Sequence, residues 1–170
     1  MLRLLLPVDD AGKRDHAVRY AALCQRESRG PIRIDLLHVE TPFSSYIASK
    51  LPPGTTERYY DEHSRAVLEP VADALTQAGI GCRTHAVVGD PVRCILESAR
   101  EVGVDRIALV THARQTIPEV LFGSVTAGVL RESPVPVEVV PMEPGSPLAV
   151  YARVAGAGAT VLTLVYLALE

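Results

Sequence analysis

The side chains best suited to chemistry stand at the ends of two apolar runs. Asp9 and Asp10 close the first run of the chain, and Thr111, His112 and Arg114 end or follow a later one. A carboxylate such as Asp9 can accept a hydrogen bond from an adenine amino group or a sugar hydroxyl. A carboxylate there can also cap the helix that follows. Asp9 therefore has a ligand-binding and a structural interpretation.

A second group of candidates opens a predicted helix near the C-terminal end of the domain. Gly123 and Ser124 follow the loop 111–118, which carries Arg114. A helix N-terminus with unpaired N–H groups, a small residue and a hydroxyl suits an anion, and a guanidinium can pair with a phosphate. The alternative is that Gly123 only allows close helix–sheet packing and Ser124 only caps the helix. Spacing leaves both interpretations open.

Several familiar chemistries have no motif in this chain. A G-x-S-x-G elbow, a G-x-x-x-x-G-K-(S/T) loop and a G-x-G-x-x-G turn are all absent, so we predict no catalytic residues. The five histidines show no metal-binding spacing, and we predict no metal site. The three cysteines form no C-x-x-C pair and are expected to be buried, reduced thiols.

Apolar runs and helical patterns alternate along the chain, which positions these candidates. Parallel strands with crossover helices imply an α/β fold, an open five-stranded parallel sheet with helices on both faces, Rossmann-like. Ligands of such folds bind beyond the carboxyl ends of the strands. Pro70 predicts a kink or break near Glu69 in the second long helix. The expected strands are 2–8, 32–39, 82–88, 106–111 and 135–140, and the expected helices are 12–29, 55–77, 91–103 and 119–131.

Composition limits the class of protein and its partners. The chain has 170 residues, 48% of them apolar, which suffices for one globular domain. Its 17 basic and 20 acidic residues give a net charge of −3 with no basic arm, and aromatic residues make up only 5%. We therefore predict no nucleic-acid partner. The first apolar run is too short for a signal peptide, which favours a cytoplasmic domain.

Four segments together carry a resemblance to a known family. They are Leu4-Leu5-Leu6-Pro7-Val8-Asp9, Leu36-Leu37-His38-Val39, Val88-Gly89-Asp90-Pro91 and the closing block 121–140. Residues 1–141 resemble a universal stress protein of the UspA type. The resemblance implies an adenine-nucleotide α-hydrolase-like fold and a stress-response or signalling module without a defined catalytic turnover. It also implies a homodimer formed by antiparallel pairing of the last strand, here Val135 to Val140.

The nucleotide-binding branch of that family carries the motif G-x-x-G-x9-G-(S/T), which this chain keeps only in part. Val110 and Ala113 replace the first two glycines, while Gly123 and Ser124 remain. A β-carbon at Ala113 disfavours positive φ and crowds a phosphate on the backbone, and Val110 is larger and branched. Two interpretations stay open: an ATP-binding, weakly hydrolysing switch and a non-binding dimer. The site that the resemblance implies for ATP or another adenine nucleotide comprises Pro7, Asp9, Val39, Thr111, His112, Arg114, Gly123, Ser124 and Val125.

The C-terminal tail differs from the rest in composition. Residues 142–147 are rich in Pro, Gly and Ser and predict a linker. From 148 to 169 the only charged residue is Arg153, and as a helix this stretch would be about 33 Å long, enough to cross a hydrocarbon core of about 30 Å. We predict an apolar helix that anchors the domain to the inner face of a membrane or contacts a membrane partner. A helix packed on the domain or its dimer mate is the alternative.

Overall fold

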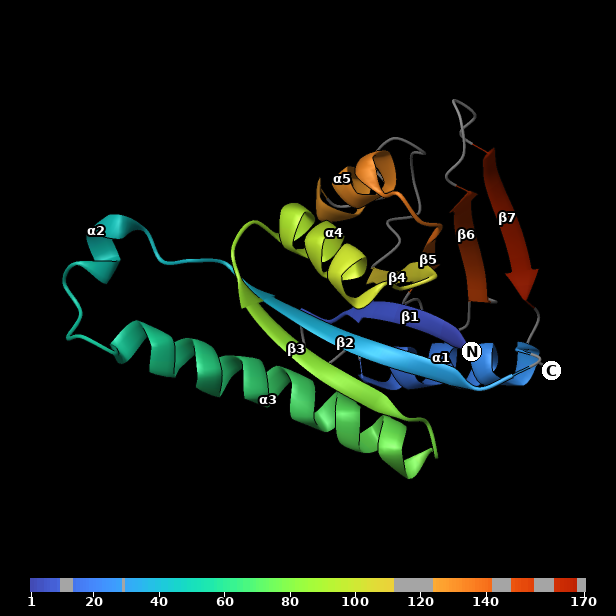
Figure 1. Cartoon of the computed structure of the whole chain (residues 1–170), viewed down its shortest axis with the longest axis horizontal. Coiled ribbons are helices and arrows are strands. Elements are labelled where there is room, and N and C mark those ends of the chain that lie inside the picture. Colours follow the sequence, from blue (N-terminus) through green and yellow to red (C-terminus); the bar gives the residue numbers. More distant parts are fainter. Residues whose placement is uncertain (10–13, 29, 112–123, 142–147, 155–160, 168–170) are drawn as a thin grey trace.

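The computed structural model describes residues 1–9, 14–28, 30–111, 124–141, 148–154 and 161–167. It contains one sheet with helices on both faces (Figure 1). The first five strands are parallel and lie in the order β3-β2-β1-β4-β5. The predicted five-stranded parallel α/β fold is confirmed. These strands are β1 (Leu2–Pro7), β2 (Ile32–Glu40), β3 (Cys82–Val88), β4 (Arg106–Thr111) and β5 (Val137–Pro141).

Two helices cover each face of this sheet, because strand side chains alternate between the faces. Leu4 and Leu6 pack in a cluster with α1 (Arg14–Glu27) and α3 (Thr55–Gln77). Leu5 packs in a second cluster with α4 (Pro91–Val102) and α5 (Ser124–Glu132). A short helix, α2 (Ser45–Ala48), lies between β2 and α3 and buries none of its residues.

Local signals set the ends of α4 as the sequence predicts. The Asp90 carboxylate accepts a hydrogen bond from the Arg93 N–H at 2.9 Å, and Pro91 takes the first helical position. Gly103 ends the helix with a φ of 68°, a conformation that glycine adopts without a β-carbon penalty. The break predicted near Glu69 is wrong, since α3 runs unbroken through Pro70. Residues buried on both sides of the proline, among them Val67 and Val71, hold the helix on the sheet.

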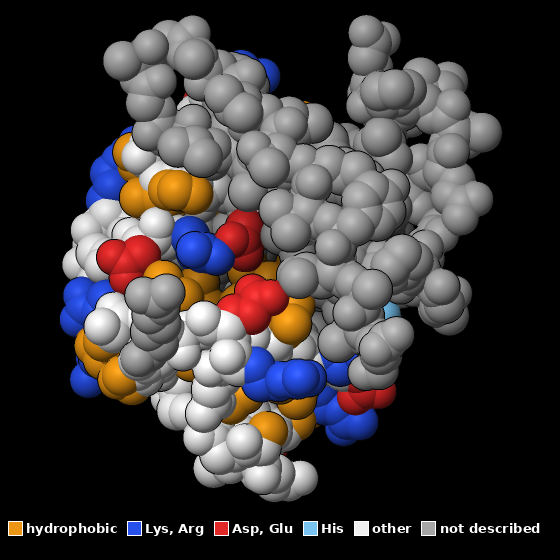
Figure 2. All heavy atoms as spheres, turned by 90° about the vertical axis from the view of Figure 1, so that its right-hand side faces the viewer, with side chains coloured by type: hydrophobic (Ala, Val, Ile, Leu, Met, Phe, Trp, Pro, Cys, Tyr) orange, Lys and Arg blue, Asp and Glu red, His pale blue; other side chains and the backbone are white. Residues whose placement is uncertain are grey.

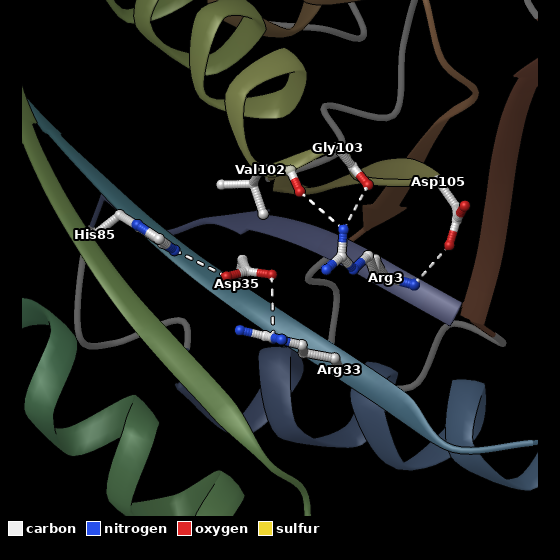
Figure 3. Close-up of polar contacts among 7 residues, drawn as sticks. All are labelled: Arg3, Arg33, Asp35, His85, Val102, Gly103 and Asp105. Carbon is white, nitrogen blue, oxygen red and sulfur yellow. Dashed lines mark hydrogen bonds and ion pairs between the residues drawn. The ribbon is translucent and has the colours of Figure 1, made fainter. Parts of the chain in front are cut away.

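Polar contacts tie neighbouring strands together (Figure 3). The Arg3 N–H donates to the Asp105 carboxylate at 2.8 Å, and its guanidinium donates to the Val102 carbonyl at 3.1 Å, which joins β1 to the turn before β4. Asp35 of β2 is almost wholly buried and accepts from His85 of β3 at 2.8 Å. Buried polar groups need such partners because an unpaired one destabilises the fold.

A buried polar cluster fastens α1 to β4 and β5. Glu138 accepts hydrogen bonds from the Tyr20 hydroxyl and the Arg106 guanidinium. Burial raises the pKa of Tyr20 well above its ordinary value, and the nearby Glu138 charge raises it further. Burial also raises the pKa of the Cys24 thiol to about 11. All three cysteines are free, Cys24 and Cys94 buried as expected and Cys82 partly exposed.

Raising the pH should destabilise the protein through Cys24. The unfolded thiol loses its proton near pH 9 while the folded one keeps it up to about 11, so the unfolded state gains charge first. Between pH 8 and pH 10 the free energy of unfolding should fall by about 1 kcal/mol from this group alone. Urea denaturation at both pH values measures the change.

The matched control for this prediction is Cys24→Ala. The variant removes the titrating thiol but leaves Tyr20, whose raised pKa acts in the same direction. We expect a smaller loss of stability between the two pH values in the variant than in the wild type. Equal losses in both proteins would contradict the assignment to Cys24.

The C-terminal tail forms strands, so the predicted apolar helix over 148–169 is wrong. Strand β6 (Leu148–Val154) pairs antiparallel with β5, and β7 (Val161–Leu167) pairs antiparallel with β6. Val and Thr within β6 and β7 favour strands, and Gly156 and Gly158 disfavour a helix. The edge of β5 also offers unpaired N–H and C=O groups that a strand can bond.

This arrangement removes the basis of the membrane prediction. None of the helices in the described residues is long and apolar enough to cross a membrane. The predicted linker, 142–147, lies outside the described residues. With the hairpin of β6 and β7, the described sheet has seven strands, and five were expected.

Charged side chains of both signs are interspersed on the described part of the face in Figure 2. Several exposed side chains pair with close neighbours along the sequence, as Arg131 does with Glu132 at 2.7 Å. Exposed pairs of this kind contribute little to stability. The interspersed charges agree with the small net charge of −3.

Candidate functional site

A pocket of about 360 Å³ lies at the carboxyl ends of the parallel strands, where the strand order reverses. From β1 the chain steps through β2 to β3 on one side, and β4 and β5 then lie on the other side of β1. The carboxyl ends at such a switch point diverge and leave a crevice for a ligand. The pocket is lined by Pro7, Val8, Asp9, Leu37, Val39, Thr41, Pro91, Ile95, Leu109, Val110, Ser124, Val125 and Thr126.

Strand alternation supplies the floor of this pocket. Leu37, Val39 and Leu109 belong to the apolar cluster on the α4 and α5 side of the sheet. Residues two positions apart share a face, which adds Thr41 to the same side as Val39. Helix α4 contributes Pro91 and Ile95, and α5 contributes its first three residues. The floor is therefore apolar, with polar groups at its margin.

Five of the nine residues predicted for the site line this pocket: Pro7, Asp9, Val39, Ser124 and Val125. Thr111 ends β4, and its side chain is not among those that the structure describes. His112, Arg114 and Gly123 lie outside the described residues. The structure thus brings together the parts of the prediction that come from β1, β2 and α5.

The two polar margins of the pocket suit different ligand groups. Asp9 is exposed just beyond β1, and Ser124 is exposed as the first residue of α5. The first N–H groups of a helix have no partner within it, and the helix dipole favours an anion there. The pocket can therefore accept a hydrogen-bond donor at Asp9 and an anionic group at Ser124.

The side chain of Val110, which replaces a motif glycine, does not lie on the main floor of the pocket. The residue contributes to the lining, but its side chain packs in the cluster on the α1 and α3 side and is only 7% exposed. Most of the lining belongs to the opposite face, with Leu109. The branched side chain in place of a motif glycine therefore points away from the main floor of the pocket. Ala113, the other replaced glycine, lies outside the described residues.

Sequence reasoning missed several lining residues that approach from neighbouring elements. Thr41 stands two positions after Val39, so strand periodicity could have found it. Pro91 follows the third strand, and Ile95 lies one helical turn later. Thr126 is buried in the first turn of α5, and nothing in the sequence marks it as a site residue.

Close packing of α4 against α5 helps to hold Ser124 in place. Gly128 of α5 faces Val92 of α4 so closely that a β-carbon on the glycine would lie 2.7 Å from a Val92 methyl carbon. A second hollow between the helices, lined by residues that include Val92 and Gly128, continues from Ser124. The spacing of the two helices thus depends on the missing side chain.

Gly128→Ala should destabilise the protein despite the better helix propensity of alanine. The clash with Val92, whose χ1 is stiff in a helix, should cost about 1–3 kcal/mol, against about 1 kcal/mol gained from propensity. Adding Val92→Ala should restore part of the loss by removing the clashing methyl groups. Thermal unfolding of both single variants and the double variant measures this coupling, and strictly additive effects would contradict it.

Comparison with known proteins places this fold and pocket in a family. The universal stress protein family matches residues 1–141. The chain belongs to the universal stress protein family. The hairpin of β6 and β7 lies beyond the matched residues.

One relative is similar in both sequence and structure. Universal stress protein MJ0577 of Methanocaldococcus jannaschii is 34% identical over 79 residues, which are 46% of this chain and 49% of that protein. The matched segment thus spans about half the length of this curated relative. The solved structure of MJ0577 superimposes with a TM-score of 0.65 and 26% identity, covering 83% of this chain and 96% of that one.

Two more distant universal stress proteins share the fold. The protein of Arabidopsis thaliana, solved with AMP bound, has a TM-score of 0.59 and 16% identity, covering 86% of this chain and 96% of its own. The protein of Archaeoglobus fulgidus, solved in complex with dAMP, has a TM-score of 0.55 and 19% identity, covering 82% and 97%.

Proposed function

We propose that this universal stress protein is a non-catalytic stress-response module that binds an adenine nucleotide and signals through its occupancy. The observation that carries the proposal is the pocket at the switch point between β1 and β4, with Asp9 at one margin and the start of α5 at the other. Fold neighbours solved with AMP and dAMP support an adenine nucleotide as the ligand.

The pocket has the size and lining that such a ligand needs. Its volume of about 360 Å³ lies in the range of small-molecule sites. The adenine ring would lie on the apolar floor that includes Val39 and Leu109, with its amino group donating to Asp9. The phosphates would then lie toward the N–H groups at Ser124, where the helix dipole stabilises negative charge.

The polar groups of the described lining can hold a ligand by hydrogen bonds. Its only ionisable side chain is Asp9, and its hydroxyl groups are those of Thr41, Ser124 and Thr126. None of these hydroxyls has a histidine or lysine beside it in the described lining to act as a general base. A weakly hydrolysing switch is the alternative, and the phosphate-release assay below distinguishes the two.

Titration with a fluorescent ATP analogue tests the proposal. We expect saturable binding to the wild type and about 10- to 150-fold weaker binding to Asp9→Ala, because a hydrogen bond to a charged group contributes about 1.5–3 kcal/mol. Ser124→Ala should weaken binding less, since the backbone N–H groups remain. Asp73→Ala, an exposed carboxylate on α3, is the matched control and should bind like the wild type.

Two outcomes, one of this titration and one of a phosphate-release assay with ATP, would overturn parts of the proposal. An absence of binding at millimolar nucleotide would favour a dimer that binds no nucleotide. Phosphate release from ATP that disappears in Asp9→Ala would favour the weakly hydrolysing switch. Binding without phosphate release is the result we expect.

The homodimer remains a proposal, but the β5 edge that was expected to form its interface is occupied within the chain. The expected interface was the edge of the last parallel strand, 135–140, and β6 now bonds to that edge within the chain. We propose that β6 and β7 take the place of a partner strand, so that pairing through β5 requires the hairpin to leave. The described sheet then ends at β3 and β7.

Comparing the full chain with a 1–145 truncation tests this competition. Light scattering after size exclusion should give the mass of a dimer for the truncated protein at concentrations where the full chain is a monomer. The reason is that truncation exposes the β5 edge, which an identical strand can pair. Equal oligomeric states of the two proteins would contradict the proposed role of the hairpin.

A cytoplasmic location is also proposed. Its support is that Cys24, Cys82 and Cys94 are all free, as is usual for proteins of reducing compartments.

A further inference from the structure

Three potential metal ligands meet at the carboxyl end of β2, on the face opposite the nucleotide pocket. His38 and Glu40 are two residues apart on β2 and share a face, and His63 reaches them from α3. The Glu40 oxygen Oε1 lies 3.1 Å from Nε2 of His38 and 2.5 Å from Nδ1 of His63. One ligand atom from each residue lies within 4.8 Å of the other two. The histidines, 25 positions apart in the chain, gave no metal-binding spacing in the sequence.

The hydrogen bonds of His38 fix which of its nitrogens faces Glu40. Its Nδ1 lies 2.7 Å from the carbonyl oxygen of Val8, and because a carbonyl only accepts, Nδ1 carries the proton. In the neutral ring Nε2 then presents a lone pair. A histidine held through Nδ1 by a backbone carbonyl, with Nε2 directed at a shared centre, is the arrangement of a metal ligand.

That lone pair faces a second acceptor. Nε2 of His38 and Oε1 of Glu40 are 3.1 Å apart, and the proton on Nδ1 of His63 is the only one that a neutral pair of histidines can offer to Oε1. Two acceptors at this distance repel unless a proton or a metal cation lies between them. His38 is 3% exposed and Glu40 is 7% exposed, so water does little to screen the repulsion.

We propose that His38, Glu40 and His63 form a three-ligand site for a divalent transition metal of the zinc type. Two imidazoles and one carboxylate, with a fourth position open, make a ligand set that Zn²⁺ adopts in proteins. Mixed nitrogen and oxygen ligands favour Zn²⁺, Cu²⁺ and Ni²⁺ over Mg²⁺ and Ca²⁺, which prefer oxygen ligands alone.

The two separations from Glu40 need only a small adjustment to admit the ion. Tetrahedral bonds of about 2.0–2.1 Å place the ligand atoms about 3.4 Å apart, close to the separation of His38 and Glu40. His63 must move outward by about 1 Å from its present hydrogen bond with Glu40, because their atoms are 2.5 Å apart. Its side chain is 45% exposed, which leaves room for this movement and for a water molecule in the fourth position.

Aromatic contacts hold the exposed ligand near the site. The Tyr59 ring stacks on His63 with centroids 5.7 Å apart and planes inclined by 10°. The His38 ring meets the His63 ring edge-on at 5.5 Å. Such contacts restrict the rotamers of His63 and reduce the entropy lost when a metal fixes it.

Metal titration of the full-length, untagged protein tests the proposal. Calorimetry with Zn²⁺ should show one ion bound per chain, and Co²⁺ should give the visible absorption of a tetrahedral site. The Co²⁺ spectrum should lack a sulfur charge-transfer band, which excludes binding at the free cysteines. Mg²⁺ should not compete.

Matched histidine variants locate the site. His63→Gln should weaken Zn²⁺ binding by at least about 100-fold, since even outer-shell partners contribute about 10- to 100-fold. His85→Gln changes a histidine of β3 that bonds Asp35 and should bind Zn²⁺ like the wild type. Because His63 is partly exposed, its variant should remain folded, which circular dichroism checks.

Three results would overturn the proposal. They are the absence of Zn²⁺ binding to the wild type, equal binding by His63→Gln and the wild type, and a Co²⁺ spectrum with sulfur ligation. The first would mean that a proton on His38, and no metal ion, separates the two acceptors.

Discussion

Burial of the central strand on both faces is the constraint on which the rest of this structure depends. Leu4, Leu5 and Leu6 of β1 are all 0% exposed. Because consecutive residues face opposite sides of the sheet, their burial requires helices on both sides. Burying each leucine contributes about 1.5–3 kcal/mol relative to leaving it exposed. The crossover helices that supply this cover also place β2 on one side of β1 and β4 on the other. The divergence of their carboxyl ends makes the crevice beside β1.

Side chains alternate between the two faces along β2, so its carboxyl end carries an apolar residue on one face and potential metal ligands on the other. Val39 faces the pocket on the α4 and α5 side, while His38 and Glu40 face α3. Val8 contributes to both sites, lining the pocket and accepting a hydrogen bond from His38. The pocket offers an apolar floor with polar margins, which suits a heterocycle carrying an anionic group. The histidine cluster offers lone pairs, which suit a cation.

The C-terminal tail forms strands because the edge of β5 lies beside it. Residues 148–167 have no charge except Arg153, and their length would suit an apolar helix. The same residues bond to β5 as β6 and β7. Pairing satisfies the open edge of a parallel sheet, whereas a helix would leave that edge exposed. The hairpin therefore belongs to the sheet and changes which edge of it is free.

The sequence by itself determined the order of the parallel strands and long helices, the ends of α4, the strand end that bears Asp9 and the helix that carries Ser124 near its start, because these depend on local periodicity and capping. It also predicted five of the lining residues. Only the tertiary structure decided the direction of the Val110 side chain, the unbroken course of α3 through Pro70, the strands of the tail and the meeting of His38 with His63. Each of these depends on packing or bonding between segments distant in the chain, and local residue preferences carry no information about which distant partner will be present.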